Sequence, residues 1–281
     1  MNNLKIIAFD LDGTLTQHKT PLSEEYREIL FKLKEKYTLV MVGAGQTRRI
    51  FEQMNRFPID IIGNYGMQYA RYNYDTDDLE TIYDISEPCD RDDCEKKVTL
   101  LREKYGFTDF SGDNVEYHPS GCVTFPLLGT KAIQEDKLVF DPDWKKRRAF
   151  YSEVTKLFSE YNVFVGGSSS FDMAPKPYNK YYALDKYCSE KGVSHSEVVF
   201  VGDDYGLGGN DESVYKSDFG FITVDDYKEF KNKIKHLLWK KIPARWVQKL
   251  WLAIEFKTGL FHEKIKLNKK QKDNGFNPLS F

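Results

Sequence analysis

The segment KIIAFDLDGT, residues 5–14, sets the architecture of the whole chain. Its apolar half, residues 5–9, predicts a short buried strand, and this strand runs into a polar loop that carries the carboxylates of Asp10 and Asp12. The same order of strand and acid recurs in VVFVGDD, residues 198–204. Ligands of α/β sheets bind at the carboxyl ends of the strands, so both loops are candidate parts of one site.

Short apolar runs alternate with helical patterns along much of the chain. Near-continuous apolar runs separated by helices are typical of a parallel sheet that is covered on both faces. We therefore expect an α/β fold with a doubly wound, Rossmann-like parallel-sheet core made of residues 1–85 and 176–238. Further core strands are expected at residues 38–42, 59–62, 198–201 and 219–224, with helices at residues 23–36 and 179–190.

The pattern of apolar and polar residues changes between residues 86 and 175. Stretches of alternating character are interrupted there by two long helical patterns, which predicts an α+β cap domain inserted into the core. Strands are expected at residues 122–125, 137–140, 163–165 and 170–173, and helices near residues 92–105 and 143–161.

The composition is that of a globular protein. The 281 residues are 41% hydrophobic and 15% aromatic, which is enough for one large or two modest domains with a core. No apolar run approaches the roughly 18 residues that span a bilayer. The four cysteines contain no CxxC pair and follow no secretory leader, so we expect a reduced, cytoplasmic setting without zinc or disulfides.

Asp10 and Asp12 have the chemistry that covalent phosphoryl transfer requires. Such a reaction needs a nucleophile in line with phosphorus, cations around the phosphoryl oxygens and an acid for the departing oxygen. Asp10 is the candidate nucleophile and a ligand for Mg²⁺, which prefers oxygen donors. Asp12 is the candidate general acid and base, and it is also predicted to belong to the metal site.

Two later segments supply the remaining groups of this predicted site. Asp203, Asn210 and Asp211 follow the strand at residues 198–201 and would complete an oxygen cage for Mg²⁺ opposite Asp10. Lys180 begins a predicted helix, where its ammonium group would offset the repulsion between carboxylate and phosphate. Each motif alone is common in surface turns and helix starts, but their joint occurrence favours one catalytic site.

Residues 10–16, DLDGTLT, resemble the signature loop of the haloacid dehalogenase superfamily, and Lys180, Asp203 and Asp211 match its later motifs in order. The resemblance covers roughly residues 4–235. Residues 172–180, DMAPKPYNK, are typical of its Cof-like sugar-phosphatase branch, which has a large α/β cap. A narrower similarity is to eukaryotic-type phosphomannomutases, in residues 42–45, 51–54, 166–172 and 202–211. The resemblance implies a phosphotransferase that works through an aspartyl-phosphate.

The similarity leaves a phosphatase and a hexose phosphate mutase open. In phosphomannomutases, cap arginines hold the far phosphate of a bisphosphorylated sugar, because the guanidinium fork binds phosphate at two points. The corresponding positions here hold Pro119, Thr130 and Lys137, and no Arg occurs between residues 106 and 144. Lys131 and Lys137 remain as weaker phosphate ligands. We therefore favour the hydrolysis of a small phosphate ester, expected to be a sugar phosphate.

Further substrate contacts are implied by the same resemblance. Ser170 and Asp172 match mutase residues that contact the sugar, although the polar face of a cap strand would also explain them. The superfamily usually offers a Ser or Thr hydroxyl after the second core strand, but residues 43–46 read GAGQ. Backbone N–H groups around Gly45 and Gln46, at a helix N-terminus, would bind the phosphate instead. Weaker phosphate affinity, or a drift toward a binding role, is the alternative.

The C-terminal extension, residues 239–281, is basic. Its formal charge is +7, against −9 for residues 1–238. Apolar residues at helical spacing predict a basic amphipathic helix within residues 239–261. Packing on the core, attachment to an anionic membrane surface and docking on a partner protein stay open, and the last two make a non-catalytic adaptor the second alternative function. The acidic body argues against nucleic-acid binding.

Overall fold

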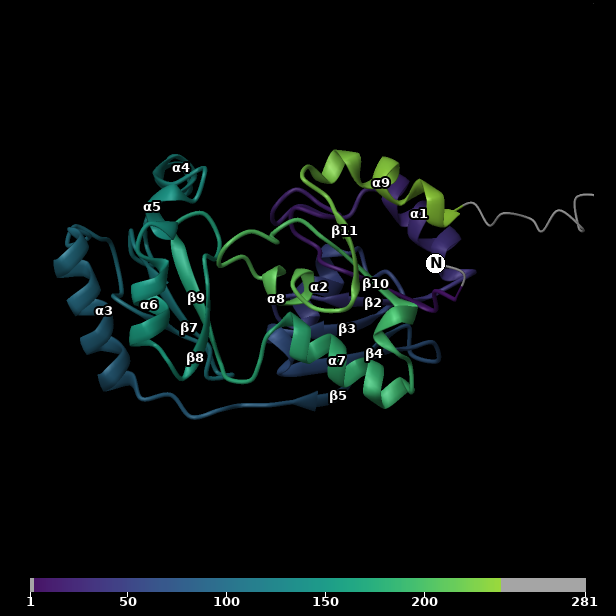
Figure 1. Ribbon diagram of the computed structural model, residues 1–281, viewed down its shortest axis with the longest axis horizontal. Coiled ribbons are helices and arrows are strands. Elements are labelled where there is room, and N and C mark those ends of the chain that lie inside the picture. The colour runs from purple at the N-terminus through teal and green to yellow at the C-terminus, as the bar shows by residue number, and fades with distance from the viewer. Residues whose placement is uncertain (1–2, 239–281) are drawn as a thin grey trace, which may run out of the picture. The chain divides into compact units, whose positions relative to one another are not determined.

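The computed structural model describes residues 3–238 (Figure 1). The predicted amphipathic helix and the predicted partner or membrane contact of residues 239–261 lie outside this range. Within the described residues, no helix combines the length and the apolar character that crossing a membrane requires.

The larger sheet of the described chain has seven strands in the order β11-β10-β1-β2-β3-β4-β5. The strands from β11 to β3 pair in parallel, and β4 and β5 extend the sheet as an antiparallel hairpin. The parallel part confirms the predicted α/β core, whereas the sequence reasoning missed the hairpin. The strands are β1 (Ile6–Phe9), β2 (Thr38–Val42), β3 (Asp60–Gly63), β4 (Gln68–Asn73), β5 (Asp78–Asp84), β10 (Val198–Gly202) and β11 (Gly220–Thr223).

Helices cover both faces of this sheet. Strand β1 contacts helices on both faces, because successive side chains of a strand point to opposite faces. Ala8 of β1 belongs to a buried cluster with Leu184 of α7 on one face. Its neighbour Phe9 meets the ring of Phe230 of α9, with centroids 6.1 Å apart. The helices are α1 (Glu24–Lys34), α2 (Thr47–Gln53), α7 (Lys180–Lys191), α8 (Glu212–Tyr215) and α9 (Phe230–Leu238), with short 3₁₀ helices η1 (Asn64–Gly66), η2 (His195–Glu197) and η3 (Tyr227–Glu229).

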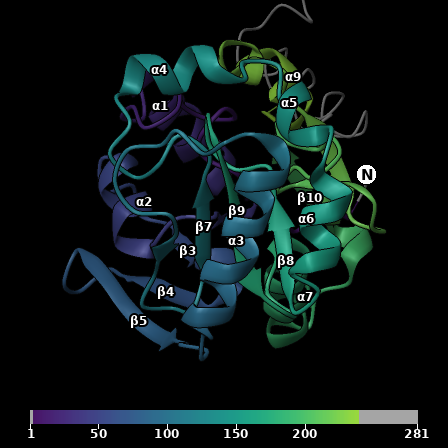
Figure 2. The same cartoon turned by 90° about the vertical axis from the view of Figure 1, so that its left-hand side faces the viewer.

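The second sheet of the described residues has four antiparallel strands in the order β6-β7-β9-β8. Figure 2 shows α3 and α6 lying across one face of this sheet. The elements are α3 (Arg91–Tyr105), β6 (Glu116–Tyr117), β7 (Val123–Pro126), α4 (Gln134–Phe140), α5 (Lys145–Arg148), α6 (Tyr151–Leu157), β8 (Tyr161–Phe164) and β9 (Ser170–Pro175).

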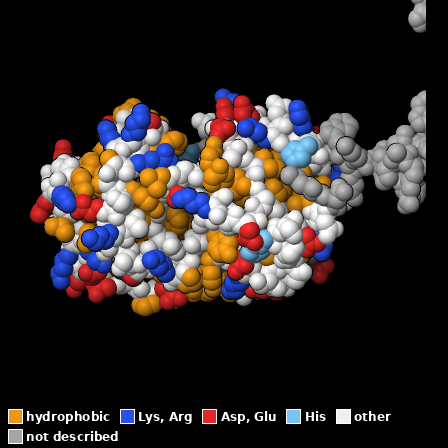
Figure 3. All heavy atoms as spheres, in the orientation of Figure 1, with side chains coloured by type: hydrophobic (Ala, Val, Ile, Leu, Met, Phe, Trp, Pro, Cys, Tyr) orange, Lys and Arg blue, Asp and Glu red, His pale blue; other side chains and the backbone are white. Residues whose placement is uncertain are grey.

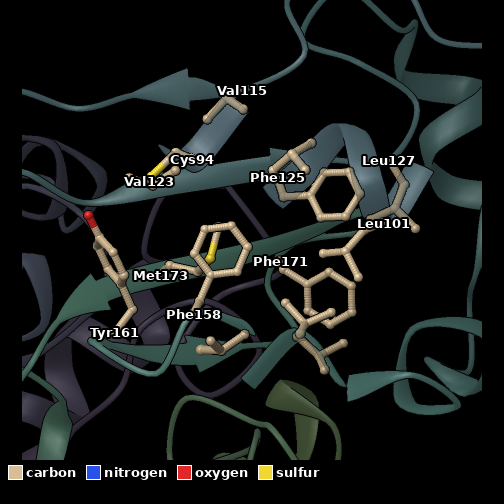
Figure 4. Packing of buried hydrophobic residues seen from close by; sticks show 14 of the residues in the cluster. Cys94, Leu101, Val115, Val123, Phe125, Leu127, Phe158, Tyr161, Phe171 and Met173 are labelled. Atoms are coloured by element: carbon tan, nitrogen blue, oxygen red, sulfur yellow. The ribbon is translucent and has the colours of Figure 1, made fainter. Parts of the chain in front are cut away.

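Aromatic and aliphatic side chains fill the space between the smaller sheet and its helices (Figure 4). Phe125 of β7 and Phe171 of β9 are fully buried, and they lie beside Leu101 of α3. Alternation along the two strands then turns Thr124 and Asp172 to the opposite face. This opposite face is therefore free to carry polar groups.

Two predictions for residues 86–175 are wrong in detail. Residues 137–140 form the end of α4 rather than a strand, and the acidic first turn of α4, with Glu135 and Asp136, favours the helix. The helix expected at residues 143–161 is split into α5 and α6, and β8 begins at Tyr161. The break falls at Phe150, whose backbone is not helical, and it follows α5, whose Arg147 donates from its buried guanidinium group to the backbone carbonyls of Gly166 and Ser170.

The strands of the smaller sheet all lie between residues 86 and 175. Contacts nevertheless gather residues Met1–Lys235 into one compact unit. The division into a core of residues 1–85 and 176–238 and a cap of residues 86–175 therefore stays a proposal.

Candidate active site

Three carboxylates meet where β1 and β10 end. Asp10 follows β1, and its backbone N–H donates to the carbonyl of Val201 in β10 over 3.0 Å. Asp10, Asp203 and Asp211 each offer one oxygen, and these oxygens all lie within 4.8 Å of one another. The predicted strand-then-acid pattern thus brings its acids together at one edge of the sheet.

Lys180 provides the positive charge at the centre of this group. Its Nζ lies 2.7 Å from Oδ1 of Asp10 and 2.7 Å from Oδ1 of Asp211, and the side chain is fully buried. The side chain of Asn179 caps α7 by accepting from the N–H of Tyr182, which sets Lys180 as the first residue of the helix. Burial opposes the charge of Lys180, but the two carboxylates outweigh it and raise its pKa.

The negative charge of the cluster exceeds what Lys180 neutralises. Burial, opposed by Lys180, raises the pKa of Asp10 to about 6. Burial, together with the nearby Asp10 and Asp211, raises the pKa of Asp203 to about 8. Burial also raises the pKa of Asp211. A cation among these oxygens would relieve both the desolvation and the mutual repulsion.

The donor set fits a hard divalent cation such as Mg²⁺. The buried Oδ1 of Asn210 has no hydrogen-bond partner within the described part of the chain, although a buried amide oxygen normally has one. The Thr14 hydroxyl donates to Oδ1 of Asp203 over 2.7 Å and orients that carboxylate. A Cβ on Gly13 would lie 2.2 Å from Oδ2 of Asp203, and φ of Gly13 is +93°, so glycine is required here.

Asp12 has a different set of partners. Its Oδ1 accepts from Nε2 of Gln53 over 2.6 Å and from the backbone N–H of Lys19 over 2.7 Å. Its Oδ2 lies 3.4 Å from a guanidinium nitrogen of Arg49. Asp12 is not one of the three acids whose oxygens lie within 4.8 Å of one another, and both of its oxygens have other partners, so we leave it out of the cation site proposed below. Asp12 lines the cavity, where the predicted proton transfer would take place.

The acids open into a cavity of about 910 Å³, which is lined by the turn after β2 on one side and by the smaller sheet on the other. The lining includes Asp10, Asp12, Asp203 and Asn210, whereas Lys180 and Asp211 lie beneath it and do not line it. The cavity can therefore hold a substrate with its phosphate against Asp10 and the rest of the molecule against the smaller sheet.

Polar groups of the smaller sheet form a connected network at the cavity wall. The Thr124 hydroxyl donates to Oδ1 of Asp172 over 3.0 Å, and Nε2 of His118 lies 3.0 Å from the same hydroxyl. The Ser170 hydroxyl is 3.3 Å from Oδ1 of Asp172. Burial raises the pKa of Asp172, and its hydrogen-bond donors oppose that shift. This wall suits the hydroxyl groups of a polar substrate.

The cavity contains most of the residues that the sequence analysis assigned to substrate binding. Gly45, Gln46, Lys137, Ser170 and Asp172 line it. Lys131 is exposed and is not among the lining residues.

The lining residues that sequence reasoning missed include Lys19, Arg49, His118 and Thr124. The spacing of Arg49 and Gln53, four apart on α2, placed both on one helix face, which is a signal that sequence reasoning could have used. The pairing of Thr124 with Asp172 depends on strand register and left no signal in the sequence.

Curated relatives of this chain carry a consistent name. A probable phosphomannomutase of Caenorhabditis elegans is 25% identical over 251 residues, which cover 83% of this chain and 95% of the relative. The phosphomannomutase of Saccharomyces cerevisiae is 26% identical over 222 residues, covering 75% of this chain and 84% of the relative. The predicted similarity to phosphomannomutases is confirmed.

Solved structures share the fold at low sequence identity. IMP-bound IMP-nucleotidase of Plasmodium falciparum superimposes with a TM-score of 0.62 at 13% identity, over 84% of this chain and 68% of the other. A haloalkanoate-superfamily phosphatase of Bacteroides thetaiotaomicron gives a TM-score of 0.55 at 18% identity, over 83% and 95%. The family model of haloacid dehalogenase-like hydrolases matches residues 7–214. The chain therefore belongs to the haloacid dehalogenase-like hydrolase family.

Proposed function

We propose that this chain is a Mg²⁺-dependent phosphatase that hydrolyses a sugar phosphate through a phosphorylated Asp10. The observation that carries the proposal is the position of the Asp10 carboxylate, which lines the cavity and is held at 2.7 Å by the buried ammonium group of Lys180. A carboxylate that is fixed in this way, at the carboxyl end of a parallel strand, is positioned to attack a bound phosphoryl group.

In the proposed reaction, a carboxylate oxygen of Asp10 bonds to phosphorus while the bond from phosphorus to the sugar oxygen breaks. Asp12, in its acid form, protonates the departing oxygen. Asp12 then takes a proton from water, and the water oxygen attacks phosphorus, which releases inorganic phosphate and restores Asp10.

The cation site of this proposal consists of Asp10, Asp203, Asn210 and Asp211. Bound Mg²⁺ would neutralise negative charge on the phosphoryl oxygens. Lys180 contributes by holding Asp10 and Asp211, and Thr14 holds Asp203.

The phosphatase is favoured over a mutase because the arginines between residues 86 and 175 do not line the cavity. Arg147 is fully buried and binds Asp141, and Arg102 donates to the carbonyls of Pro126 and Leu127. Thr130 and Lys137, which occupy two of the positions where the mutases have arginines, line the cavity. A phosphorylated intermediate without a bidentate clamp is expected to be lost to water.

A phosphomannomutase-type hexose phosphate mutase is the second candidate, because the curated relatives carry that name and support it equally well. The polar network around Asp172 suits the hydroxyl groups of a hexose in either reaction.

One set of assays tests both candidates. Purified protein with Mg²⁺ is incubated with a panel of sugar phosphates, and inorganic phosphate is measured. The phosphatase predicts phosphate release that disappears in Asp10→Asn. The mutase predicts interconversion of hexose 1- and 6-phosphates, stimulated by a hexose bisphosphate. The enzyme proposal would be refuted if neither inorganic phosphate nor an interconverted hexose phosphate appeared, or if Asp10→Asn kept full activity.

A further inference from the structure

The guanidinium group of Arg49 lies directly against Gly45, in the turn that follows β2. A Cβ on Gly45 would meet the guanidinium nitrogens at 2.2 and 2.6 Å. Gly45 carries no positive φ, so the backbone there would accept alanine, and the space for a side chain is taken by Arg49. A side chain at position 45 would therefore displace the guanidinium group of Arg49.

This turn is the neighbour of the nucleophile. Phe9 of β1 pairs with Met41 of β2, so Asp10 and residues 43–45 leave the same edge of the sheet side by side. Asp10, Gly45 and Arg49 all line the same cavity. The guanidinium group thus lies on the wall of the cavity that Asp10 also lines, against the turn that leaves the sheet beside Asp10.

Arg49 is held there by contacts that can be exchanged. Its terminal nitrogen donates to Oε1 of Gln53 over 2.7 Å and lies 3.4 Å from Oδ2 of Asp12. The side chain of Arg49 is 44% exposed, so a rotation toward a ligand leaves no buried charge behind. Asp12 keeps its bonds to Gln53 and to the N–H of Lys19 when Arg49 moves.

The site needs such a cation. Lys180 is fully buried, and its ammonium group is already shared by Asp10 and Asp211. Among the described residues, the Lys and Arg side chains that line the cavity are Lys19, Arg49 and Lys137. Lys137 belongs to α4, whereas Arg49 of α2 lies against the turn of residues 43–45, which leaves the sheet beside Asp10. A dianionic phosphoryl group meets several carboxylates here, and a guanidinium fork would offset their repulsion.

We propose that Arg49 binds the phosphoryl oxygens at the turn of residues 43–45 and exchanges its contact with Asp12 for one with the phosphate. Once Arg49 has moved to the phosphate, Asp12 no longer contacts the guanidinium group and can protonate the departing oxygen. The proposal rests on the proposed function in that the ligand carries a phosphoryl group, but it does not require that the ester is a sugar phosphate or that water is the acceptor.

The test measures the dissociation constant of inorganic phosphate for the full chain in the presence of Mg²⁺, by calorimetry. Arg49→Gln is expected to weaken binding by about 10- to 100-fold, as the loss of a charge-assisted bond does. Arg48→Gln is the matched control, because Arg48 lies on the same helix but binds Asp78 at the surface. This control should leave the dissociation constant and the melting temperature unchanged.

Gly45→Ala supplies an independent test in which the charge is retained. The added Cβ would push away the far end of a flexible side chain rather than backbone, so the variant should fold and lose phosphate affinity much as Arg49→Gln does. Because both changes act through the guanidinium group, the double variant should bind no more weakly than either single variant. Arg49→Lys keeps the charge without the fork, and intermediate affinity is expected.

The proposal is overturned if Arg49→Gln binds phosphate as the parent does, if the losses from Gly45→Ala and Arg49→Gln add, or if the parent binds no phosphate. These outcomes are separate from those of the activity assays. Phosphate affinity that depends on Arg49 in a protein that hydrolyses no ester would refute the proposed function and keep Arg49 as the phosphate ligand.

Discussion

Replacement of the buried Lys180 by methionine is expected to destabilise the metal-free protein by about 3–5 kcal/mol. Methionine is similar in length to the lysine stem, so the cavity term is small and the loss is electrostatic. Each ion pair of Lys180, at 2.7 Å, attracts by about 4 kcal/mol or more at an effective dielectric of 20, and removing the ammonium group recovers several kcal/mol of its desolvation. The buried carboxylates of Asp10 and Asp211 then lack their counter-charge.

For a chain of this size, such a loss corresponds to a fall of roughly 6–20 °C in melting temperature. The assay is thermal unfolding followed by circular dichroism in the presence of a chelator, with urea unfolding as a second measure of the free energy. Lys5→Met is the matched control, since Nζ of Lys5 lies 2.9 Å from Oε1 of Glu197 but its side chain is 53% exposed. An exposed pair contributes at most about 1 kcal/mol, so this control should change little.

The double variant Lys180→Met with Asp211→Asn should regain part of the loss, because one uncompensated buried carboxylate is removed together with the ammonium group. Equal melting temperatures for Lys180→Met and Lys5→Met would refute the reasoning that the buried cluster depends on Lys180. A double variant that is less stable than Lys180→Met would contradict the claim that the remaining penalty is electrostatic.

Three further predictions concern the metal, one histidine and the smaller sheet. Mg²⁺ should raise the melting temperature of the parent in a concentration-dependent way and not that of Asp203→Asn, and equal shifts in both would place the cation elsewhere. Burial opposes the charge of His195, but Asp218 and Asp185 raise its pKa, so its stabilising charge is present below the unfolded pKa and is lost as pH rises through the folded pKa. His195→Gln should therefore destabilise more at about pH 6 than at about pH 8.5, and an equal effect at both would count against the ion pairs. Phe171→Ala, at a fully buried ring, should cost about 3–5 kcal/mol in urea unfolding, whereas a loss below about 1 kcal/mol would show that the site collapses around the gap.

The face of the molecule seen in Figure 3 carries charges of both signs. Figure 3 shows acidic and basic side chains interspersed over the face in view rather than gathered by sign. Charge substitutions are expected to have larger effects where the charges are buried, at Lys180 and its carboxylates.

The parallel strands could be predicted because their pattern does not depend on context. Strands β1, β2, β3 and β10 are buried on both faces, so each reads as an unbroken apolar run. The hairpin β4–β5 escaped prediction because β5 is largely exposed and carries a mixed pattern. Residues 137–140 were wrongly predicted to form a strand, because Leu138 and Val139 resemble the apolar residues of a strand. In the structure they are exposed on a short helix.

The proposed nucleophile, the proposed proton shuttle and the acids of the proposed cation site could be named from the sequence, because each follows an apolar strand and such positions lie at one edge of a parallel sheet. Tertiary structure decided the rest. The hydrogen bond of Gln53 to Asp12, the ion pairs of Lys180 with Asp10 and Asp211, and the pairing of Thr124 with Asp172 all depend on how elements far apart in the chain pack. The local sequence pattern indicates which face of a helix or strand is buried. Which other element covers that face depends on the tertiary packing of the whole chain.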